Sequence, residues 1–435
     1  MIDKKRVFLL ELNEFNLQLL ESGARELDLK NLQKLLAFSR IQTVTKDAYE
    51  SDFLEPWVQW VSIHTGVDSS KHKIKHLGDL SHLRVTQLWE ELSERGITSG
   101  VWGAMNASRG RAELAKFFLP DPWTASENAY SEELQALLDP IRYLSTNYLN
   151  RSNKIFLKKL KGIFRLFRAN GLVWAFLKEL LYLSKNLLQY GCKSFVFISI
   201  FDYLSTLLFV QYKKRYDPDF SILFLNSLAH LQHHHWKQLN PMQSPPLVYG
   251  LRYIDKILGV LFDAIEEGEV FFVANALSQK NTSEEKPWIL YRQKDQKQFL
   301  DQLNIAHTRV ESLMTHDAHI YFASEKMMQL AKKALSNLSV FGQKLFLVEE
   351  SAEDRNKLFY RIAFTDEIPA ETMFLHAGVE YRFFDLFQVI VKRTGKHIPT
   401  GIVLVNQKSS VEQMPNHELF HTIVGYYEKK SSDRR

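Results

Sequence analysis

Cysteine is nearly absent from this chain of 435 residues, in which the only one is Cys192. A single cysteine has no disulfide partner within the chain, so we expect a protein of a reducing compartment, on the cytoplasmic side. Charge of one sign is also scarce, since 55 Lys and Arg stand against 50 Asp and Glu. The resulting net charge of +5 is too small to indicate nucleic-acid binding, and we expect no such partner.

Long apolar runs are rare as well. The opening residues, "MIDKKRVFLLELNEFN", contain an apolar run of only about five residues before Glu11, which is too short for a signal peptide. Residues 195–212 form a run of 18 with one charge, Asp202, at the lower length limit for a membrane span. Polar residues interrupt this run, which favours a core element, and a membrane segment stays open as the alternative.

Short apolar runs that suit β-strands do occur, at residues 6–12, 98–103, 220–225 and 269–274. Residues 247–267, between the last two, have apolar residues spaced as in a helix. This alternation predicts an α/β fold, with a mostly parallel sheet and helices on both faces. Ligands of such sheets bind beyond the carboxyl ends of the strands.

Two segments interrupt the alternation and read as insertions. Residues 125–217 are almost entirely helical in pattern, and residues 283–385 are mixed, with a helix expected at 323–338 and strands at 344–350 and 357–364. The predicted sheet core then consists of residues 1–124, 218–282 and 386–435.

The helical insertion contains a basic stretch, residues 151–183, with no acidic residue before Glu179. A basic amphipathic helix with aromatic residues on its apolar side can lie in the headgroup layer of an anionic membrane. Alternatively, the helix covers the sheet and its lysines are simply solvated. The first reading predicts membrane contacts by Lys158, Lys159, Lys161 and Arg165, with four aromatic residues available to enter the headgroup layer: Phe156, Phe164, Phe167 and Trp174.

The segment "NSLAHLQHHHW", residues 226–236, contains four histidines: His230, His233, His234 and His235. Imidazole is a common metal ligand. Three consecutive residues cannot all face one ion on a strand or a helix, so at most two of these side chains are candidate ligands. A polar loop or helix start is the alternative.

An ordered series of motifs links this segment to others. After the first strand and Asn13 come "EPWVQWVSIHTGVDSSKHKI" (55–74), the histidine segment, "NALSQ" (275–279) and "TGKHIPTGIVL" (394–404). The series resembles the alkaline phosphatase superfamily, in particular its type I phosphodiesterase and nucleotide pyrophosphatase branch. That resemblance implies a site in which Asp and His residues hold two divalent ions and a Thr or Ser attacks the phosphate.

The resemblance also shows what this chain lacks. Asn13 stands in place of the first Asp, Ala229 in place of a second, and Asn275 and Ala276, or Ala276 and Leu277, in place of an Asp-His pair. The nucleophile position falls on Glu55 or Pro56. The matching positions are these: Trp60, Ser62, Thr65, Gly66, His72, Ile74, His233, Trp236, Gly395, His397 and Gly401. The two-metal site and the nucleophile are therefore expected not to be retained.

A rebuilt site with one ion is a second expectation. Glu11, Glu14 and Glu55 fall near the expected edge, and one carboxylate could join His233 and His397 on a zinc or manganese ion; the alternative is that no metal binds. We take Glu11 as that ligand. The other candidates are Glu55, Asn13 and Asn275 for catalysis, and His72, His230 and Trp60 for substrate contact.

The resemblance implies a phosphoester or phosphoanhydride hydrolase, or a phosphotransferase, acting on a phosphorylated small molecule. Members with an opening similar to "LELNEFN" are associated with bacterial surface-polysaccharide biosynthesis, which suggests a lipid-linked sugar intermediate. The alternative is a non-catalytic scaffold or a binding protein on the inner membrane face. We expect no strong zinc-dependent turnover of simple aryl phosphate esters, because ligand and nucleophile positions are changed.

Overall fold

The computed structural model describes residues 5–48, 53–80, 83–147, 153–191, 194–237, 240–313, 316–351 and 354–428, without the side chains of 146–147, 153–158, 194 and 241. Cys192 lies outside these residues. The chain forms two compact units. The first contains residues 1–142, 153–281 and 395–435, and the second contains residues 143–152 and 282–394. Most of the predicted helical insertion thus belongs to the same unit as the sheet, and the second unit extends past residue 385.

The first unit is built on an eight-stranded sheet with the order β20-β2-β19-β6-β1-β5-β3-β4. The strands are β1 (Val7–Leu12), β2 (Ser39–Val44), β3 (Ser99–Trp102), β4 (Ala115–Leu119), β5 (Phe220–Leu225), β6 (Val270–Ala274), β19 (Thr400–Val405) and β20 (Gln413–Pro415). Only β19 pairs antiparallel with its neighbours, so the predicted mostly parallel sheet is confirmed among the described residues. A separate antiparallel pair joins β7 (Ser278–Asn281) to β18 (Gly395–Ile398).

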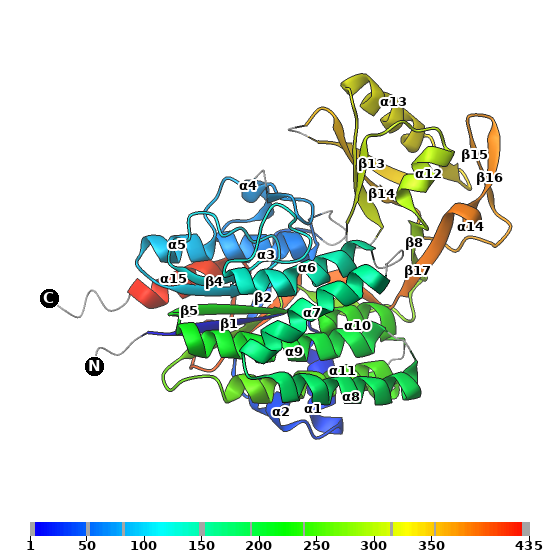
Figure 1. Cartoon of the computed structure of the whole chain (residues 1–435). Helices are drawn as coiled ribbons and strands as arrows, with labels where there is room; N and C mark the ends of the chain where they lie inside the picture. The colour runs from blue at the N-terminus through cyan, green and yellow to red at the C-terminus, as the bar shows by residue number, and fades with distance from the viewer. Residues whose placement is uncertain are drawn as a thin grey trace. The chain divides into compact units, whose positions relative to one another are not determined.

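Helices cover both faces of this sheet (Figure 1). The alternation of β1 sends Phe8, Leu10 and Leu12 to one face and Val7, Leu9 and Glu11 to the other. The first face packs against α1 (Leu17–Glu26), α2 (Lys30–Leu36), α6 (Glu132–Asn147), α7 (Asn153–Ala169), α9 (Ser194–Tyr216), α10 (Ser227–His235) and α11 (Pro245–Phe262). The second packs against α3 (Pro56–Thr65), α5 (Leu88–Glu94) and α15 (Glu418–Glu428). The described residues of the unit also form α4 (Ser69–His72), α8 (Val173–Tyr190) and the 3-10 turn η2 (Pro241–Gln243).

Helix α9 contains the long apolar run. By length and composition alone, residues 195–216 could cross a membrane, but 61% of their most apolar window is buried inside the fold. Leu208, Phe209 and Tyr212 are buried in the core that α9 forms with the sheet, and the Trp102 indole of β3 donates a hydrogen bond to Ser205 Oγ at 2.8 Å. This burial favours the core-helix alternative.

The second unit is a mixed α/β structure with its own core. Its four-stranded antiparallel sheet has the order β13-β14-β10-β9. The elements are β8 (Trp288–Gln293), α12 (Gln296–Gln302), β9 (Arg309–Ser312), β10 (Asp317–Tyr321), α13 (Glu325–Ser336), β11 (Ser339–Val340), β12 (Gln343–Lys344), β13 (Phe346–Glu350), β14 (Lys357–Ile362), β15 (Met373–His376), β16 (Val379–Arg382), α14 (Phe383–Leu386) and β17 (Phe387–Arg393). The helix and the two strands expected from the sequence thus occur as α13, β13 and β14.

The three central parallel strands end at the same level. Leu12 pairs with Leu225, and Glu11 pairs with Ala274. The residues that follow these strands, Asn13, Asn226 and Asn275, therefore lie together at one edge of the sheet, where the sequence predicted a site.

Candidate metal centre

Glu14 is the carboxylate that reaches the predicted edge. Its backbone has a φ of 55°, in the left-handed region, so the chain turns sharply after β1. The Glu14 N–H donates to the Asn275 carbonyl at 3.1 Å, which ties this turn to the end of β6. Helix α1 begins only at Leu17, so Glu14 lies in the turn between β1 and this helix.

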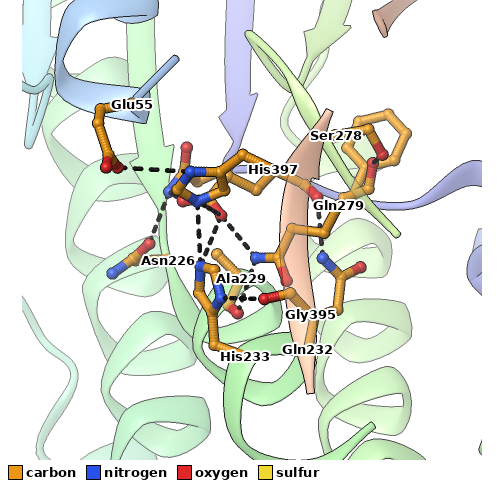
Figure 2. A network of polar contacts seen from close by, with 12 residues as sticks. Glu55, Asn226, Ala229, Gln232, His233, Ser278, Gln279, Gly395 and His397 are labelled. Atoms are coloured by element: carbon orange, nitrogen blue, oxygen red, sulfur yellow. Dashed lines mark hydrogen bonds and ion pairs between the residues drawn. The ribbon is translucent and has the colours of Figure 1, made fainter. Parts of the chain in front are cut away.

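Glu14 meets two histidines from distant parts of the chain. Its Oε2 atom lies 2.9 Å from His233 Nε2 of α10 and 2.9 Å from His397 Nε2 of β18. The two Nε2 atoms are 3.2 Å apart. Figure 2 shows His233 and His397 pointing toward one another, with Glu55 beside His397. Three potential ligand atoms from three distant segments of the chain thus converge on one point.

Backbone contacts orient both rings for metal binding. His233 Nδ1 lies 3.1 Å from the Gly395 carbonyl, and His397 Nδ1 lies 3.1 Å from the Leu54 carbonyl. A carbonyl only accepts, so each Nδ1 carries a hydrogen, which leaves each Nε2 as the ring atom that could bind a metal ion. Metal-binding histidines are usually held by such contacts to the second ring nitrogen.

The spacing of the three atoms fits a zinc-like ion. Ligands about 2.0–2.1 Å from a tetrahedral ion lie about 3.3 Å from one another. The three edges here, 2.9, 2.9 and 3.2 Å, are slightly shorter than that. Two histidines and one carboxylate are also a known ligand set for a catalytic zinc that keeps its fourth position for a water or a substrate.

The surrounding side chains hold the Glu14 carboxylate in place. Asn13 Nδ2 donates to Glu14 Oε1 at 2.8 Å, and Gln279 Nε2 donates to Glu14 Oε2 at 2.5 Å. Burial raises the pKa of Glu14, but the positive charge of protonated His397 and His233 outweighs this effect and holds the pKa well below its usual value. Glu14 is therefore an anion, as a metal ligand must be.

Gly395 and Gly401, the two glycines of the "TGKHIPTGIVL" motif, allow close packing beside the triad of Glu14, His233 and His397. A Cβ on Gly395 would lie 2.1 Å from Gln279 Oε1 and 2.9 Å from the Gln232 carbonyl oxygen. A Cβ on Gly401 would lie 2.7 Å from Asn275 Oδ1. Neither position has room for a side chain. Packing therefore explains the two glycines of the Gly-x-His-x-x-x-Gly motif, and its histidine, His397, supplies the candidate ligand.

Glu11 does not take the predicted place. It lies on the face of the sheet that α3 covers, and its Oε1 is 2.5 Å from His64 Nε2 in a fully buried pair. A strand residue three positions before Glu14 projects into the core, whereas Glu14 lies in the turn beyond the strand. The carboxylate beside His233 and His397 is thus Glu14, and we replace Glu11 by Glu14 in the candidate ligand set.

Asn13 and Asn275 position the edge instead of facing open space. The amide of Asn13 donates to Glu14 and to Asn226 Oδ1, and its oxygen accepts from Trp60 Nε1 at 2.8 Å. Asn275 donates from Nδ2 to the Phe15 carbonyl and accepts from the Ile402 N–H. Because these amide groups are used inside the protein, we assign both residues a positioning role.

The three residues predicted to contact substrate each make contacts inside the protein. Trp60 is fully buried beneath Asn13. His72 is buried, and its Nδ1 accepts from the Ile74 N–H, so its Nε2 hydrogen points at Ser62 Oγ, 3.0 Å away. This tautomer cannot activate Ser62 as a base would. His230 stacks on His234 with ring centroids 4.1 Å apart, and burial lowers the pKa of His230 to about 3.

Glu55 lies at the rim of the site. It is the N-cap residue of α3, and its Oε2 is 3.4 Å from His397 Nδ1. Gln279 and Gln232 were not foreseen from the sequence, although both contact Glu14. Gln279 pairs with His397 across β7 and β18, and this pairing of segments more than a hundred residues apart has no local signal.

No family model matches the chain, and no curated protein matches it. Solved structures match it over nearly its whole length. Human ectonucleotide pyrophosphatase/phosphodiesterase 5 matches at 11% identity and a TM-score of 0.45, covering 98% of this chain and 95% of that one. Phosphonoacetate hydrolase from Sinorhizobium meliloti 1021, in complex with phosphonoformate, matches at 13% identity and a TM-score of 0.42, covering 97% and 96%. Both proteins are members of the alkaline phosphatase superfamily, which the motif series of this chain also resembles.

Proposed function

We propose that this protein binds one divalent ion through Glu14, His233 and His397 and acts on a phosphate-linked metabolite, as a phosphoester or phosphoanhydride hydrolase or as a phosphotransferase. The observation that carries the proposal is the triangle of Glu14 Oε2, His233 Nε2 and His397 Nε2, with edges of 2.9, 2.9 and 3.2 Å. A zinc or manganese ion held there would supply Lewis-acid polarisation of a phosphoryl oxygen and would favour deprotonation of a water.

The described residues support direct attack by water over a phospho-enzyme. Ser62 Oγ donates to the Val58 carbonyl and contacts His72, and Thr65 Oγ1 donates to the Val61 carbonyl at 2.7 Å. Both hydroxyls are thus engaged inside α3, away from Glu14. Ser51, the third hydroxyl considered, lies outside the described residues.

Glu55 has the position to receive a proton from such a water. It lies beside His397 at the N-terminus of α3, and its side chain is partly exposed, whereas Glu14 is buried among its partners. The positive end of the α3 dipole at this point also favours an anionic phosphate group. In this proposal Glu14, His233 and His397 hold the ion, Glu55 takes the proton, and Asn13 and Gln279 fix Glu14.

The finer substrate assignment follows from the resemblance in the sequence. A sugar phosphate, nucleotide sugar or lipid-linked sugar intermediate of bacterial surface-polysaccharide biosynthesis is the substrate class that we propose to test first. Simple aryl phosphate esters are expected to be poor substrates, because Asn13, Asn275 and Ala276 leave no carboxylate or imidazole for a second ion.

The test is metal binding by the purified protein, followed by activity. Elemental analysis and calorimetric titration with zinc and with manganese should show a single site in the wild type. His233→Ala and Glu14→Gln should each weaken binding by at least about 100-fold, equivalent to about 2.7 kcal/mol. His234→Ala is the matched control. It removes a neighbouring imidazole that stacks on His230, and it should leave the metal affinity unchanged.

Activity on the phosphate-linked panel should disappear with a chelator and return with the preferred ion. Absence of metal binding, or binding that survives both His233→Ala and His397→Ala, would overturn the metal centre. Robust zinc-restored turnover of aryl phosphate esters would overturn the proposed loss of the second ion.

A further inference from the structure

Helix α8 carries an apolar stripe on its solvent side. Trp174, Leu177, Leu181 and Leu188 follow one another at intervals of three, four and seven residues, which places them on one face of the helix. Trp174 is 82% exposed, Leu181 72% and Leu188 91%. Of the 18 exposed large hydrophobic residues in the described part of the chain, seven lie on α7 and α8. Such a concentration marks an interaction surface.

The opposite face of α8 is fixed to the protein. Glu179 is buried, and its carboxylate accepts hydrogen bonds from Lys256 Nζ at 2.5 Å and from Tyr253 Oη at 2.9 Å, both on α11. Asn186 Nδ2 donates to Tyr249 Oη at 2.9 Å. These contacts set the rotation of α8 about its axis. The contacts of the opposite face therefore keep the apolar stripe of α8 on the solvent side.

Helix α7 completes the surface. Phe167 is buried against Phe176 of α8, with ring centroids 4.8 Å apart, while Phe164 stays partly exposed. This outcome combines the two alternatives predicted for the basic segment, since one aromatic residue joins the core and two, Phe164 and Trp174, do not. The side chains of Lys158 and Phe156 lie outside the described residues. A groove between the two helices is lined by Leu160, Lys161, Phe164, Arg165, Phe176 and Leu180.

The charges around the stripe and the groove have one sign. Lys161, Arg165 and Arg168 of α7 and Lys178 and Lys185 of α8 are all exposed. The only acidic residue between residues 151 and 190 is Glu179, which is buried and faces Lys256. Lys159 is set apart from this group because it lies 3.9 Å from Asp139 of α6.

We propose that α7 and α8 form a docking surface for an anionic lipid bilayer. The exposed Trp and Leu side chains would enter the boundary between headgroups and acyl chains, and the five basic side chains would meet the lipid phosphates while their stems lie along the apolar surface. A second copy of the chain is a poor occupant. A two-fold contact would bring the same five positive charges together from both sides.

The surface runs toward the end of the unit that carries the candidate metal centre. Tyr190, the last residue of α8, packs on Phe195 of α9, and Phe195 packs on His235 of α10, each at 5.5 Å between ring centroids. His235 is two residues from His233 on the same helix. Docking through the α8 stripe would thus hold α10, and the site at its end, near the bilayer. The docking proposal does not depend on the metal centre.

The test is flotation of the full-length protein with vesicles of phosphatidylcholine alone or of phosphatidylcholine mixed with phosphatidylglycerol, at low and at high salt. Binding to the anionic vesicles should exceed binding to the neutral ones by at least about tenfold and should fall by a similar factor at high salt. Lys161→Glu with Arg165→Glu should abolish it. Lys326→Glu with Lys344→Glu, two exposed lysines of the second unit, is the matched control and should bind as the wild type does.

The variant Trp174→Ser, Leu181→Ser, Leu188→Ser tests the apolar part without disturbing the core. It should unfold at the same denaturant concentration as the wild type and lose vesicle binding at least about tenfold. Equal binding to both vesicle types, or no binding in any condition, would overturn the proposal. So would concentration-dependent self-association that this variant abolishes while the wild type ignores vesicles, because the stripe would then be a subunit interface.

Discussion

Two carboxylate–imidazole groups lie three residues apart on the chain, at and just beyond the end of β1, and they differ in almost every physical respect. Glu14 meets two imidazoles near the surface, where the His233 side chain is 14% exposed and the His397 side chain 9%. Glu11 meets one imidazole, that of His64, and both side chains are 0% exposed. Among the described atoms, Glu11 Oε2 and His64 Nδ1 have no hydrogen-bond partner.

The difference shows what separates a candidate centre from a structural pair. In the Glu14 group, three potential metal-ligand atoms converge, each ring is held by a contact to its second nitrogen, and an exchanging ligand has access from the surface. In the Glu11 group, only Glu11 Oε1 and His64 Nε2 face one another, and solvent does not reach them. The pair can share a proton, but it leaves no position for an exchanging ligand. Similar side chains close in sequence thus acquire different roles because the strand sends one into the core and the turn sends the other to the edge.

The largest effect is expected from breaking the buried Glu11–His64 pair. His64→Leu would leave the Glu11 carboxylate buried without its partner, which should lower the free energy of unfolding by about 3–5 kcal/mol. Denaturant unfolding monitored by circular dichroism measures the loss. The double variant Glu11→Leu, His64→Leu is the control and should recover much of the stability, because it removes both polar groups. A loss below about 1 kcal/mol for His64→Leu would show that the pair contributes no more than a surface ion pair.

The triad side can be broken without touching a ligand. Gly395→Ala would force the Gln232 backbone and the Gln279 side chain to move, since the new Cβ would lie 2.9 Å and 2.1 Å from their oxygens. Because Gly395 also accepts from His233 and Gln279 donates to Glu14, zinc affinity should fall by about 10–100-fold. Calorimetric titration measures this. Gly425→Ala, at a helix position with open space around the new Cβ, should leave zinc affinity unchanged; equal effects of the two substitutions would contradict the role of close packing.

Asn13 lies between the two groups, and Asn13→Asp asks whether the lost half of a two-ion site can be restored. The substitution would remove the hydrogen bond that Asn13 donates to Glu14. It would also place a second negative charge beside the Glu14 carboxylate. We expect the metal-free protein to lose about 1–3 kcal/mol of stability and to regain it with zinc. Elemental analysis should still find a single equivalent, since Asn275 and Ala276 remain. Two bound equivalents would show that one carboxylate is enough to rebuild the second position.

Much of the fold was predictable from the sequence because apolar periodicity reports which residues are buried. The strands at 220–225 and 269–274 occur almost as expected, since a central parallel strand is apolar on both faces and polar just beyond its end. His233 and His397 were predicted on a different basis, the resemblance of their motifs to those of a known family.

The identity of the third ligand could not be predicted. Choosing Glu14 over Glu11 depends on a left-handed turn at Glu14, and a φ of 55° in a non-glycine residue has no local sequence signal. The roles of Gln279 and Gln232 depend on the pairing of β7 with β18 and on the packing of α10. Contacts of this kind arise from tertiary structure, which periodicity does not report.

The smallest net effect in the wild type is expected from two opposite pH dependences, one on each side, which largely cancel. On the α3 side, burial lowers the pKa of His72 to about 4, below its ordinary value of 6.5, so the unfolded state binds the extra proton in this window and stability should rise with pH from about 4 to 6.5. On the α10 side, burial raises the pKa of Asp202 from 3.8 to about 6, although the carboxylate accepts from the Asn226 and Ser227 N–H groups; the folded state binds the extra proton, so stability should fall as pH rises from 3.8 to about 6. Each slope is at most about 1.4 kcal/mol per pH unit. Unfolding free energies measured across pH 4–6.5 should therefore rise less with pH in His72→Gln than in the wild type, and more steeply in Asp202→Asn. Parallel curves for all three proteins would mean that neither side chain changes its protonation on unfolding.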